Sequence, residues 1–452
     1  MTEKKEKMPI GFYMCSLTFS FERAAYYASK WLLYVYLTAA IVQGGLAIDN
    51  GQAAMMQSNL VAFTYIAPIV GGIIADRFFG ARYLIPLGLL IMAVGYFIGG
   101  SVESIGGMWA LIIFVSIGTG FFKTNLSAVT GNLFKDEATK NKAFSTQYSF
   151  VNVGSFVGTT LVGILYVTLG SNGKYGFLAC FKLAALICVI GAIWFIFAWR
   201  FLGNVGKRPF KEDADEQEVA SKVRKPLKPF EKRRVKAIIL ISFFSIIFWI
   251  FWYLTYLSVY DYAPKYVNLT MKSGFEIPTA WFDSANAFWC VLMGPVLGMV
   301  WLKLSKRPQG DMSIFKKLAL GLFFLGVSFL MLVGAEVQRG IGASEAHKAS
   351  IIWIILFAFL LTLGEMVFSP LGNAFISRYS PKKIVSTMMA VWTIATFVSA
   401  KSYGAIYNWI LKFDFLKTYI AIAAILIILA AMLLVFEKPM ASLVKLREGE
   451  IE

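Results

Sequence analysis

Long apolar segments separated by short polar ones extend along almost the whole chain. A helix that crosses the hydrocarbon core of a bilayer needs about 20 apolar residues, and twelve segments reach that length. We expect these helices at residues 9–41, 51–77, 82–101, 107–133, 141–168, 176–200, 235–263, 279–303, 314–336, 350–378, 384–410 and 416–437. The longest of them are expected to tilt or protrude. The pattern predicts an all-α polytopic membrane protein with 12 transmembrane helices.

The longest polar segment divides these helices into six and six. It covers 202–234 and contains charges of both signs together with prolines, which favours a flexible or partly helical connector over a docking site for a partner. Two sets of six helices indicate two pseudo-symmetric bundles around a central cavity. We therefore expect an N-terminal bundle at 1–201, a cytoplasmic linker at 202–234, a C-terminal bundle at 235–437 and a cytoplasmic tail at 438–452.

Composition strengthens this prediction. Of the 452 residues, 58 % are hydrophobic and only 15 % are charged, whereas an ordinary soluble domain has about a quarter of its residues charged. A soluble enzyme, a disordered chain and a coiled coil are all excluded by this balance.

The basic residues orient the chain in the membrane. If the N-terminus is cytoplasmic, 31 of the 43 lysines and arginines fall on cytoplasmic segments, 7 on outer loops and 5 within the helices. Because cytoplasmic loops carry the excess of positive charge, both termini are expected in the cytoplasm and the protein in the cell membrane. The net charge of +17 then matches the anionic lipid surface, so membrane lipid is an expected partner and nucleic acid is not.

The rarer residue types argue against an enzyme or a metal protein. The four cysteines lie in apolar runs without ligand-like spacing, and the only histidine, His347, lies in a polar stretch. Histidine-dependent nucleophilic catalysis and histidine-ligated metal sites are therefore not expected. We expect no cofactor and no metal. The N-terminal MTEKKEKMPI is too polar for a signal peptide, so the first helix should stay in the membrane.

Ionisable residues deep inside the predicted helices are candidates for function, because burying them in a bilayer is costly. In the first helix, Arg23, Tyr27 and Lys30 share one helical face, and Glu22 and Tyr26 form the adjacent stripe. A carboxylate, two cations and two phenols thus lie together. A buried Glu–Arg pair that only fixes helix packing remains the alternative.

Two further deep charges lie in other helices. Lys123 lies in the fourth predicted helix and Glu365 in the tenth. The N-terminal half thus contains mainly deep positive charge and the C-terminal half one deep carboxylate. A cavity between the halves would suit a small zwitterion such as a short peptide, with Arg23 and Lys123 binding its carboxylate and Glu365 its amine. Structural ion pairs are the alternative for Lys123 and Glu365.

Several motifs containing these residues resemble one membrane protein family. They are FERAAYY at 21–27, GTGFFKTN at 118–125, FSTQYSFVNVGSF at 144–156, LGEMVFSPLG at 363–372 and TMMAVW at 387–392. Over nearly the whole chain they resemble the proton-dependent oligopeptide transporter family, a branch of the major facilitator superfamily. GGIIADRFFGAR at 71–82 resembles the loop that follows helix two in that superfamily. The resemblance implies the major facilitator fold.

The resemblance also implies roles for individual residues. Proton coupling and carboxylate binding would involve Glu22, Arg23 and Lys123, with Glu365 binding the amine and sharing in proton coupling. Asp76 and Arg77 would be conformational-switch contacts. The remaining residues expected in the peptide site are Tyr26, Tyr27, Tyr65, Asn152 and Trp392, the last as the wall of a side-chain pocket.

Three positions depart from the family pattern. Phe19 stands where the first glutamate of the helix-one motif is expected, and Thr124 follows Lys123 where the family has proline. Helix seven has Tyr253 and Leu254 in place of the expected acidic and amide residues. A gating pair between helices one and seven is therefore altered, and Lys30 with Asp261 is a candidate substitute.

The resulting hypothesis is a secondary active transporter that imports di- or tripeptides with protons by alternating access and works as a monomer. One alternative retains the fold and has altered coupling, or carries another amphipathic zwitterion or anion as a facilitator. A membrane receptor that binds peptides without transport is the less favoured alternative.

Overall fold

A computed structural model of the chain describes residues 8–209, 226–308, 310, 312–446 and 450. The chain divides into two compact units, Met1–Ala214 and Asp215–Glu452. Residues 210–225 of the expected linker lie outside the described residues, as do parts of both tails.

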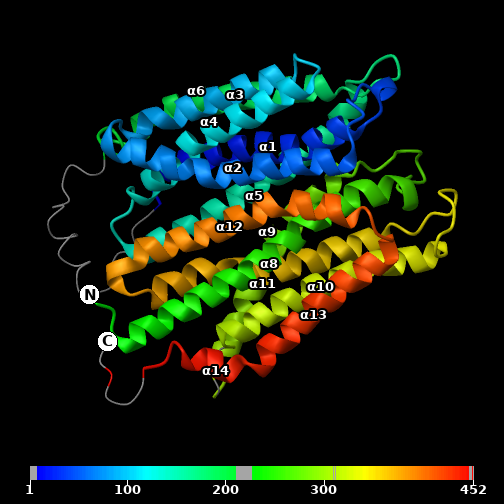
Figure 1. Cartoon of the computed structure of the whole chain (residues 1–452). Helices are drawn as coiled ribbons and strands as arrows, with labels where there is room; N and C mark the ends of the chain where they lie inside the picture. Colours follow the sequence, from blue (N-terminus) through cyan, green and yellow to red (C-terminus); the bar gives the residue numbers. More distant parts are fainter. Residues whose placement is uncertain (1–7, 210–225, 309, 311, 447–449, 451–452) are drawn as a thin grey trace. The chain divides into compact units, whose positions relative to one another are not determined.

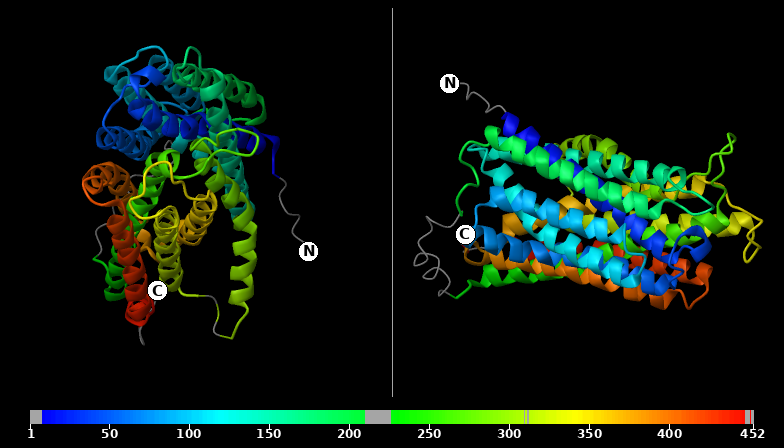
Figure 2. Two further views of the ribbon diagram at one scale, coloured as in Figure 1. Left: turned by 90° about the vertical axis from the view of Figure 1, so that its right-hand side faces the viewer. Right: turned by 90° about the horizontal axis from the view of Figure 1, so that it is seen from above.

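Six long helices form the N-terminal unit (Figure 1). They are α1 (Ile10–Thr38), α2 (Asn50–Arg77), α3 (Ala81–Gly99), α4 (Ile105–Gly131), α5 (Glu137–Thr168) and α6 (Phe177–Ala198), with short 3-10 turns at Ile41–Gln43 and Trp199–Phe201. Helix α3 packs on α4 and α6, α2 packs on α4, and α1 packs on α5 and α6. Figure 2 shows these blue-to-green helices running side by side over most of their length.

Six further long helices form the C-terminal unit. They are α8 (Pro229–Tyr266), α9 (Ala280–Ser305), α10 (Ile314–Arg339), α11 (Ile352–Tyr379), α12 (Val385–Ile410) and α13 (Phe415–Val435), followed by the short α14 (Glu437–Ser442), with one 3-10 turn at Lys382–Ile384. Helix α10 packs on α11 and α13, α12 packs on α8, and α9 packs on α11.

The long helices agree closely with the twelve predicted from the apolar pattern. Within the described residues, ten are long enough and apolar enough to cross a membrane. The other two, α1 and α12, are of similar length but do not meet this criterion, and α1 contains Glu22, Arg23 and Lys30. The prediction of an all-helical chain is therefore confirmed.

The clearest difference from the predicted boundaries is the start of α8. This helix begins at Pro229 rather than at 235, so 229–234 of the expected linker are helical. Proline is well suited to the first helical position because its missing N–H needs no partner there. The side chain of Glu231 also accepts a hydrogen bond from the Lys228 backbone N–H at 2.7 Å, which stabilises this helix start.

Glycines allow α1 and α5 to approach closely. A Cβ atom on Gly158 would lie 2.3 Å from the Ala24 carbonyl oxygen, and one on Gly154 would lie 2.4 Å from the Ser20 carbonyl oxygen. The two glycines are four residues apart and therefore share one helical face. The Ser20 hydroxyl donates to the Phe150 carbonyl at 2.8 Å in the same contact. Small residues at the interface thus bring the backbones together, as in other membrane helix pairs.

We expect Gly158→Ala to lower the thermal stability of the detergent-purified protein, because the added methyl group meets backbone rather than a movable side chain. Overpacking of this kind costs about 1–3 kcal/mol. The same substitution at Gly298 in α9 is the matched control, since no atom lies within 4 Å of its added Cβ and alanine favours a helix more than glycine does. Equal melting temperatures for the two variants would contradict the close approach of α1 and α5.

Candidate functional site

A buried ion pair on α1 is the centre of the charged residues in the N-terminal unit. Nε and Nη2 of Arg23 donate to the two carboxylate oxygens of Glu22. Glu22 is 0 % exposed and Arg23 is 7 % exposed. Two-point pairing of this kind is the strongest that arginine makes with a carboxylate. It also compensates both charges in a place where an unpaired charge would be costly.

Aromatic rings surround the guanidinium of this pair. The Arg23 Cζ atom lies 4.5 Å from the centre of the Tyr26 ring, 5.6 Å from that of Tyr27 and 5.7 Å from that of Phe19. The Tyr26 hydroxyl forms a hydrogen bond of 3.3 Å with Thr64 Oγ1 on α2. Cation–π contacts add attraction where water is excluded. The carboxylate, guanidinium and phenols expected from the α1 sequence therefore do lie together.

Lys123 and Tyr65 form a second cation–aromatic contact, between α4 and α2. The Lys123 Nζ atom lies 4.9 Å from the centre of the Tyr65 ring. The two helices approach closely nearby, because a Cβ on Gly71 would lie only 2.0 Å from the Gly120 carbonyl oxygen. Gly120 precedes Lys123 by three residues, so the same close contact holds the lysine against α2.

Lys30 lies two turns beyond Arg23 on α1. Its Nζ atom is 5.5 Å from the centre of the Tyr27 ring, and the side chain is buried. Its backbone carbonyl accepts a hydrogen bond from the Gln57 side chain on α2 at 2.9 Å. Tyr27 thus lies between two cations, Arg23 and Lys30, along one face of the helix.

Asn152, expected in the peptide site, lies on α5. Asn152 is buried, and its side-chain amide donates to the Tyr148 carbonyl one turn earlier in the same helix at 3.0 Å. Tyr148 itself is 42 % exposed. Asn152 therefore lies on the packed side of α5, in the helix that Gly154 and Gly158 bring against α1.

Glu365 on α11 is the centre of a separate polar cluster in the C-terminal unit. Its Oε2 atom accepts hydrogen bonds from Trp252 Nε1 on α8 at 3.2 Å and from Asn286 Nδ2 on α9 at 2.8 Å. Asn286 also donates to Thr362 Oγ1 at 3.0 Å. Glu365 is 8 % exposed. These two donors carry no charge, and they connect the carboxylate on α11 to α8 and α9.

The Trp392 ring of α12 packs on α11 near this cluster. A Cβ atom on Gly372 would lie 2.0 Å from the Trp392 ring, so only glycine leaves room for the indole there. Gly372 follows Glu365 by seven residues, which places both on the same helical face. The indole of Trp392 thus packs against the face of α11 that carries Glu365.

Two other carboxylates of the C-terminal unit are bound by phenols. The Tyr407 hydroxyl of α12 donates to Asp261 of α8, and the Tyr260 hydroxyl donates to Asp283 of α9. Asp283 is 3 % exposed and precedes Asn286 by three residues. The expected pair of Lys30 with Asp261 would join residues of different units, and it stays a prediction.

Asp76 and Arg77 are the last two residues of α2. They follow Tyr65 by eleven and twelve residues and therefore lie about 16–18 Å farther along the helix axis. Arg77 is exposed and Asp76 is half-buried. They thus lie at a helix end, away from the aromatic cluster, and their role as conformational-switch contacts stays a prediction.

Sequence reasoning missed the neutral partners of the charged residues. Thr64, Trp252, Asn286 and Thr362 all form hydrogen bonds to candidate residues or to their partners, and none of them was selected. The signal available was weak: Asn286 is a polar residue in an apolar run, WFDSANAFW. Which carboxylate it binds depends on how three helices pack.

Comparisons with known proteins agree with this architecture. The sequence model of the POT family matches residues 82–213 and 207–422. The chain is 26 % identical to the peptide transporter YePEPT of Yersinia enterocolitica, over 95 % of this chain and 94 % of that protein. It is also 26 % identical to a di-/tripeptide transporter of Lactococcus lactis, over 96 % of each chain.

Solved structures support the same fold. A crystal structure of a POT family transporter in complex with 5-aminolevulinic acid has a TM-score of 0.84 and 23 % identity, over 96 % of this chain and 97 % of that one. The fold is therefore the major facilitator fold of a multi-pass membrane protein, as predicted. Since the family model matches well over half of the residues, the chain belongs to the POT family, a family of transporters rather than enzymes.

Proposed function

We propose that this protein imports di- and tripeptides together with protons by alternating access. Membership of the POT family supports this, as do relatives in Yersinia and Lactococcus that are named as peptide transporters. The observation that contributes most is the distribution of charge. The N-terminal unit contains the buried cation Arg23 and the half-buried cation Lys123, each beside aromatic rings. The C-terminal unit contains a buried carboxylate that accepts from Trp252 and Asn286.

A zwitterionic peptide has one group for each of these clusters. Arg23 and Lys123 bind its carboxylate, and Glu365 binds its ammonium group. Charged hydrogen bonds of this type are about twice as strong as neutral ones, so the two ends of the peptide backbone provide much of the recognition. The residues proposed to line the rest of the site are Tyr26, Tyr27, Tyr65, Asn152 and Trp392.

Proton coupling is assigned to the same charged residues. Protonation of Glu22 removes the negative charge that holds Arg23, and so frees the guanidinium to bind substrate. Protonation of Glu365 removes the negative charge that holds the ammonium group of the peptide, and so releases that group. One proton moving inward down a membrane potential contributes about 2.3 kcal/mol per 100 mV, which is enough to drive accumulation.

The proposal also includes the orientation of the chain in the membrane and its oligomeric state. Both termini face the cytoplasm, because most of the basic residues lie on that side. Lys30 with Asp261, and Asp76 with Arg77, act as gating contacts on opposite sides of the membrane. The protein works as a monomer, because one chain provides both charged clusters.

The environment of Phe19 favours a second candidate function, a facilitator with altered coupling or another zwitterionic substrate. The family motif has a carboxylate at this place, whereas here an apolar ring, 8 % exposed, packs near Arg23 and the Phe122 ring. Arg23 therefore has one acidic neighbour fewer than the motif provides. If the protein is such a facilitator, its substrate should equilibrate across the membrane without accumulating.

Uptake of a labelled dipeptide into proteoliposomes tests both functions. We expect accumulation above the external concentration with an inward proton gradient, and competition by unlabelled dipeptide. An N-acetylated dipeptide is the matched control, because it lacks the ammonium that Glu365 binds and should compete weakly. Equilibration without accumulation would favour the facilitator, and no entry at all would refute the proposed substrate class.

A further inference from the structure

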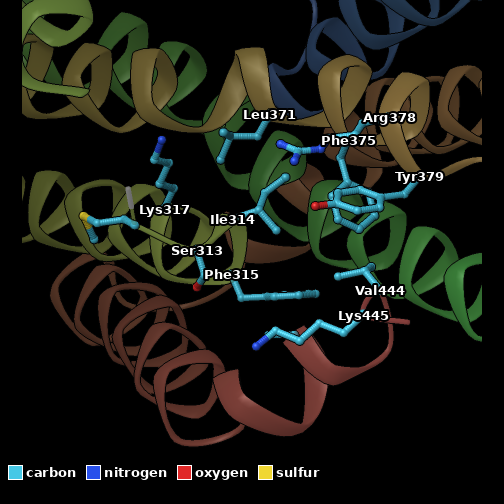
Figure 3. A pocket seen from close by; sticks show the side chains of 12 residues that line it. Ser313, Ile314, Phe315, Lys317, Leu371, Phe375, Arg378, Tyr379, Val444 and Lys445 are labelled. Atoms are coloured by element: carbon cyan, nitrogen blue, oxygen red, sulfur yellow. The ribbon is translucent and has the colours of Figure 1, made fainter. Parts of the chain in front are cut away.

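A cavity of about 450 Å³ opens at one end of the C-terminal unit, away from Glu365 (Figure 3). Its lining comes from three parts of the chain: the start of α10, the C-terminal third of α11, and α14 with the segment that follows it. The twelve lining residues are Met312, Ser313, Ile314, Phe315, Lys317, Leu371, Phe375, Arg378, Tyr379, Ala441, Val444 and Lys445. No part of the proposed transport mechanism uses them.

The polar lining of this cavity is cationic. Figure 3 shows the Arg378 guanidinium and the Tyr379 hydroxyl on one side and the Lys445 ammonium on the opposite side. None of the twelve lining residues, all of them described, is acidic. Among the described part of the chain, Arg378 and Lys445 form no side-chain ion pair. The described lining thus presents two cations, Arg378 and Lys445, to an anion in the cavity.

A third cation and a helix start add to the positive potential. Lys317 lies at the edge of the cavity, 8 % exposed, with its Nζ atom 4.4 Å from the centre of the Trp301 ring. Helix α10, 26 residues long, begins at Ile314, with Ser313 as its N-cap. The positive end of the helix dipole therefore points toward the cavity.

The segment after α14 is held in place by α8. Arg233 Nη2 donates to Glu450 Oε2 at 2.6 Å and to the Lys445 carbonyl at 3.4 Å. Arg234 Nε donates to the Val444 carbonyl at 3.5 Å. These contacts fix Val444 and Lys445 at the cavity, so less conformational entropy is lost when a ligand binds there.

The lengths of α10 and α11 favour a position of the cavity at the depth of lipid headgroups. Helix α11 has 28 residues and is therefore about 42 Å long, whereas the hydrocarbon core is about 30 Å thick. Arg378 is the penultimate residue of α11 and Ile314 the first of α10. Helix α10, with 26 residues, is about 39 Å long. Both helices thus exceed the thickness of the hydrocarbon core, and we place the end of α11 and the start of α10 in the layer that contains phosphate groups.

The apolar lining distinguishes a lipid from a free anion. Ile314, Phe315, Leu371 and Phe375 provide the rest of the lining beside the cations. A free phosphate ion gains nothing from contact with an apolar surface. The glycerol and first methylene groups of a phospholipid can pack against it. A basic pocket between helices at a membrane surface is the kind of site that binds anionic headgroups.

We propose that this cavity binds the phosphate headgroup of an anionic phospholipid, with Arg378 and Lys445 as its ligands. Titration of phosphatidylglycerol into the detergent-purified full chain, read out as thermal stabilisation, tests this. We expect the Arg378→Gln/Lys445→Gln variant to need about tenfold more phosphatidylglycerol for half-maximal stabilisation. Phosphatidylcholine, which has no net charge, should stabilise both proteins weakly and equally.

Two comparisons make the result decisive. The matched control is Lys303→Gln/Lys306→Gln, which removes two exposed cations from the end of α9, outside the cavity. Equal loss in the control and the cavity variant would show a general surface effect and overturn the proposal. Inorganic phosphate that stabilises as well as the lipid, with the same dependence on Arg378 and Lys445, would also overturn it in favour of a free anion. If the double variant misfolds, Lys445→Glu alone should still weaken the lipid response.

Discussion

Uptake of a labelled dipeptide driven by an inward proton gradient is expected to fall roughly 100-fold when Glu365 is replaced by Gln. Glutamine has nearly the same shape, and its carbonyl oxygen still accepts from Trp252 or Asn286. Helices α8, α9 and α11 should therefore pack as before. What is lost is the negative charge that we assign to the ammonium of the peptide. Initial rates in proteoliposomes with an imposed pH gradient measure the effect.

Two variants make this result specific. Glu437→Gln removes a half-buried carboxylate at the start of α14, outside the Glu365 cluster, and should leave uptake unchanged. Glu365→Asp retains the charge on a shorter side chain and should recover part of the activity. Unchanged gradient-driven uptake by the Glu365→Gln protein, at equal amounts of reconstituted transporter, would refute the role of this residue in both binding and coupling.

The apolar pattern was sufficient to predict the helices, because a bilayer requires long apolar segments and permits few other structures. It predicted the deep charges equally well, since Glu22, Arg23 and Glu365 are conspicuous among apolar neighbours. Helix ends were predicted less accurately. Helix α8 begins six residues before the expected position, where Pro229 and a hydrogen bond to Glu231 stabilise its start, and hydropathy does not detect either feature.

The partners of the deep charges were harder to predict, because they depend on contacts between helices far apart in sequence. Asn286 and Glu365 are 79 residues apart, yet they form a direct hydrogen bond. Asp261 also accepts a hydrogen bond from the Tyr407 hydroxyl within its own unit, a contact that the sequence did not predict, while its pairing with Lys30 stays a prediction. A sequence shows which buried polar groups need hydrogen-bond partners. Which of the many neutral donors becomes the partner depends on how the helices pack.

Arg23→Gln is expected to destabilise the protein strongly as well as to abolish uptake. Glu22 is fully buried, and both of its oxygens accept from Arg23. Removing one member of a buried ion pair leaves an uncompensated charge and costs about 3–5 kcal/mol. The variant should therefore melt well below the parent protein in detergent, and should not accumulate dipeptide at any proton gradient.

The double variant Glu22→Gln/Arg23→Gln separates the two effects. Two neutral amides can hydrogen-bond to each other, and replacing both members of a buried pair is far less costly than breaking it. Thermal stability should therefore recover toward that of the parent. Uptake should remain absent, because neither the guanidinium that binds the peptide carboxylate nor the carboxylate that releases it is present. If uptake recovered together with stability, the pair would be only a packing element of α1, and the proton-coupled release of Arg23 would be refuted.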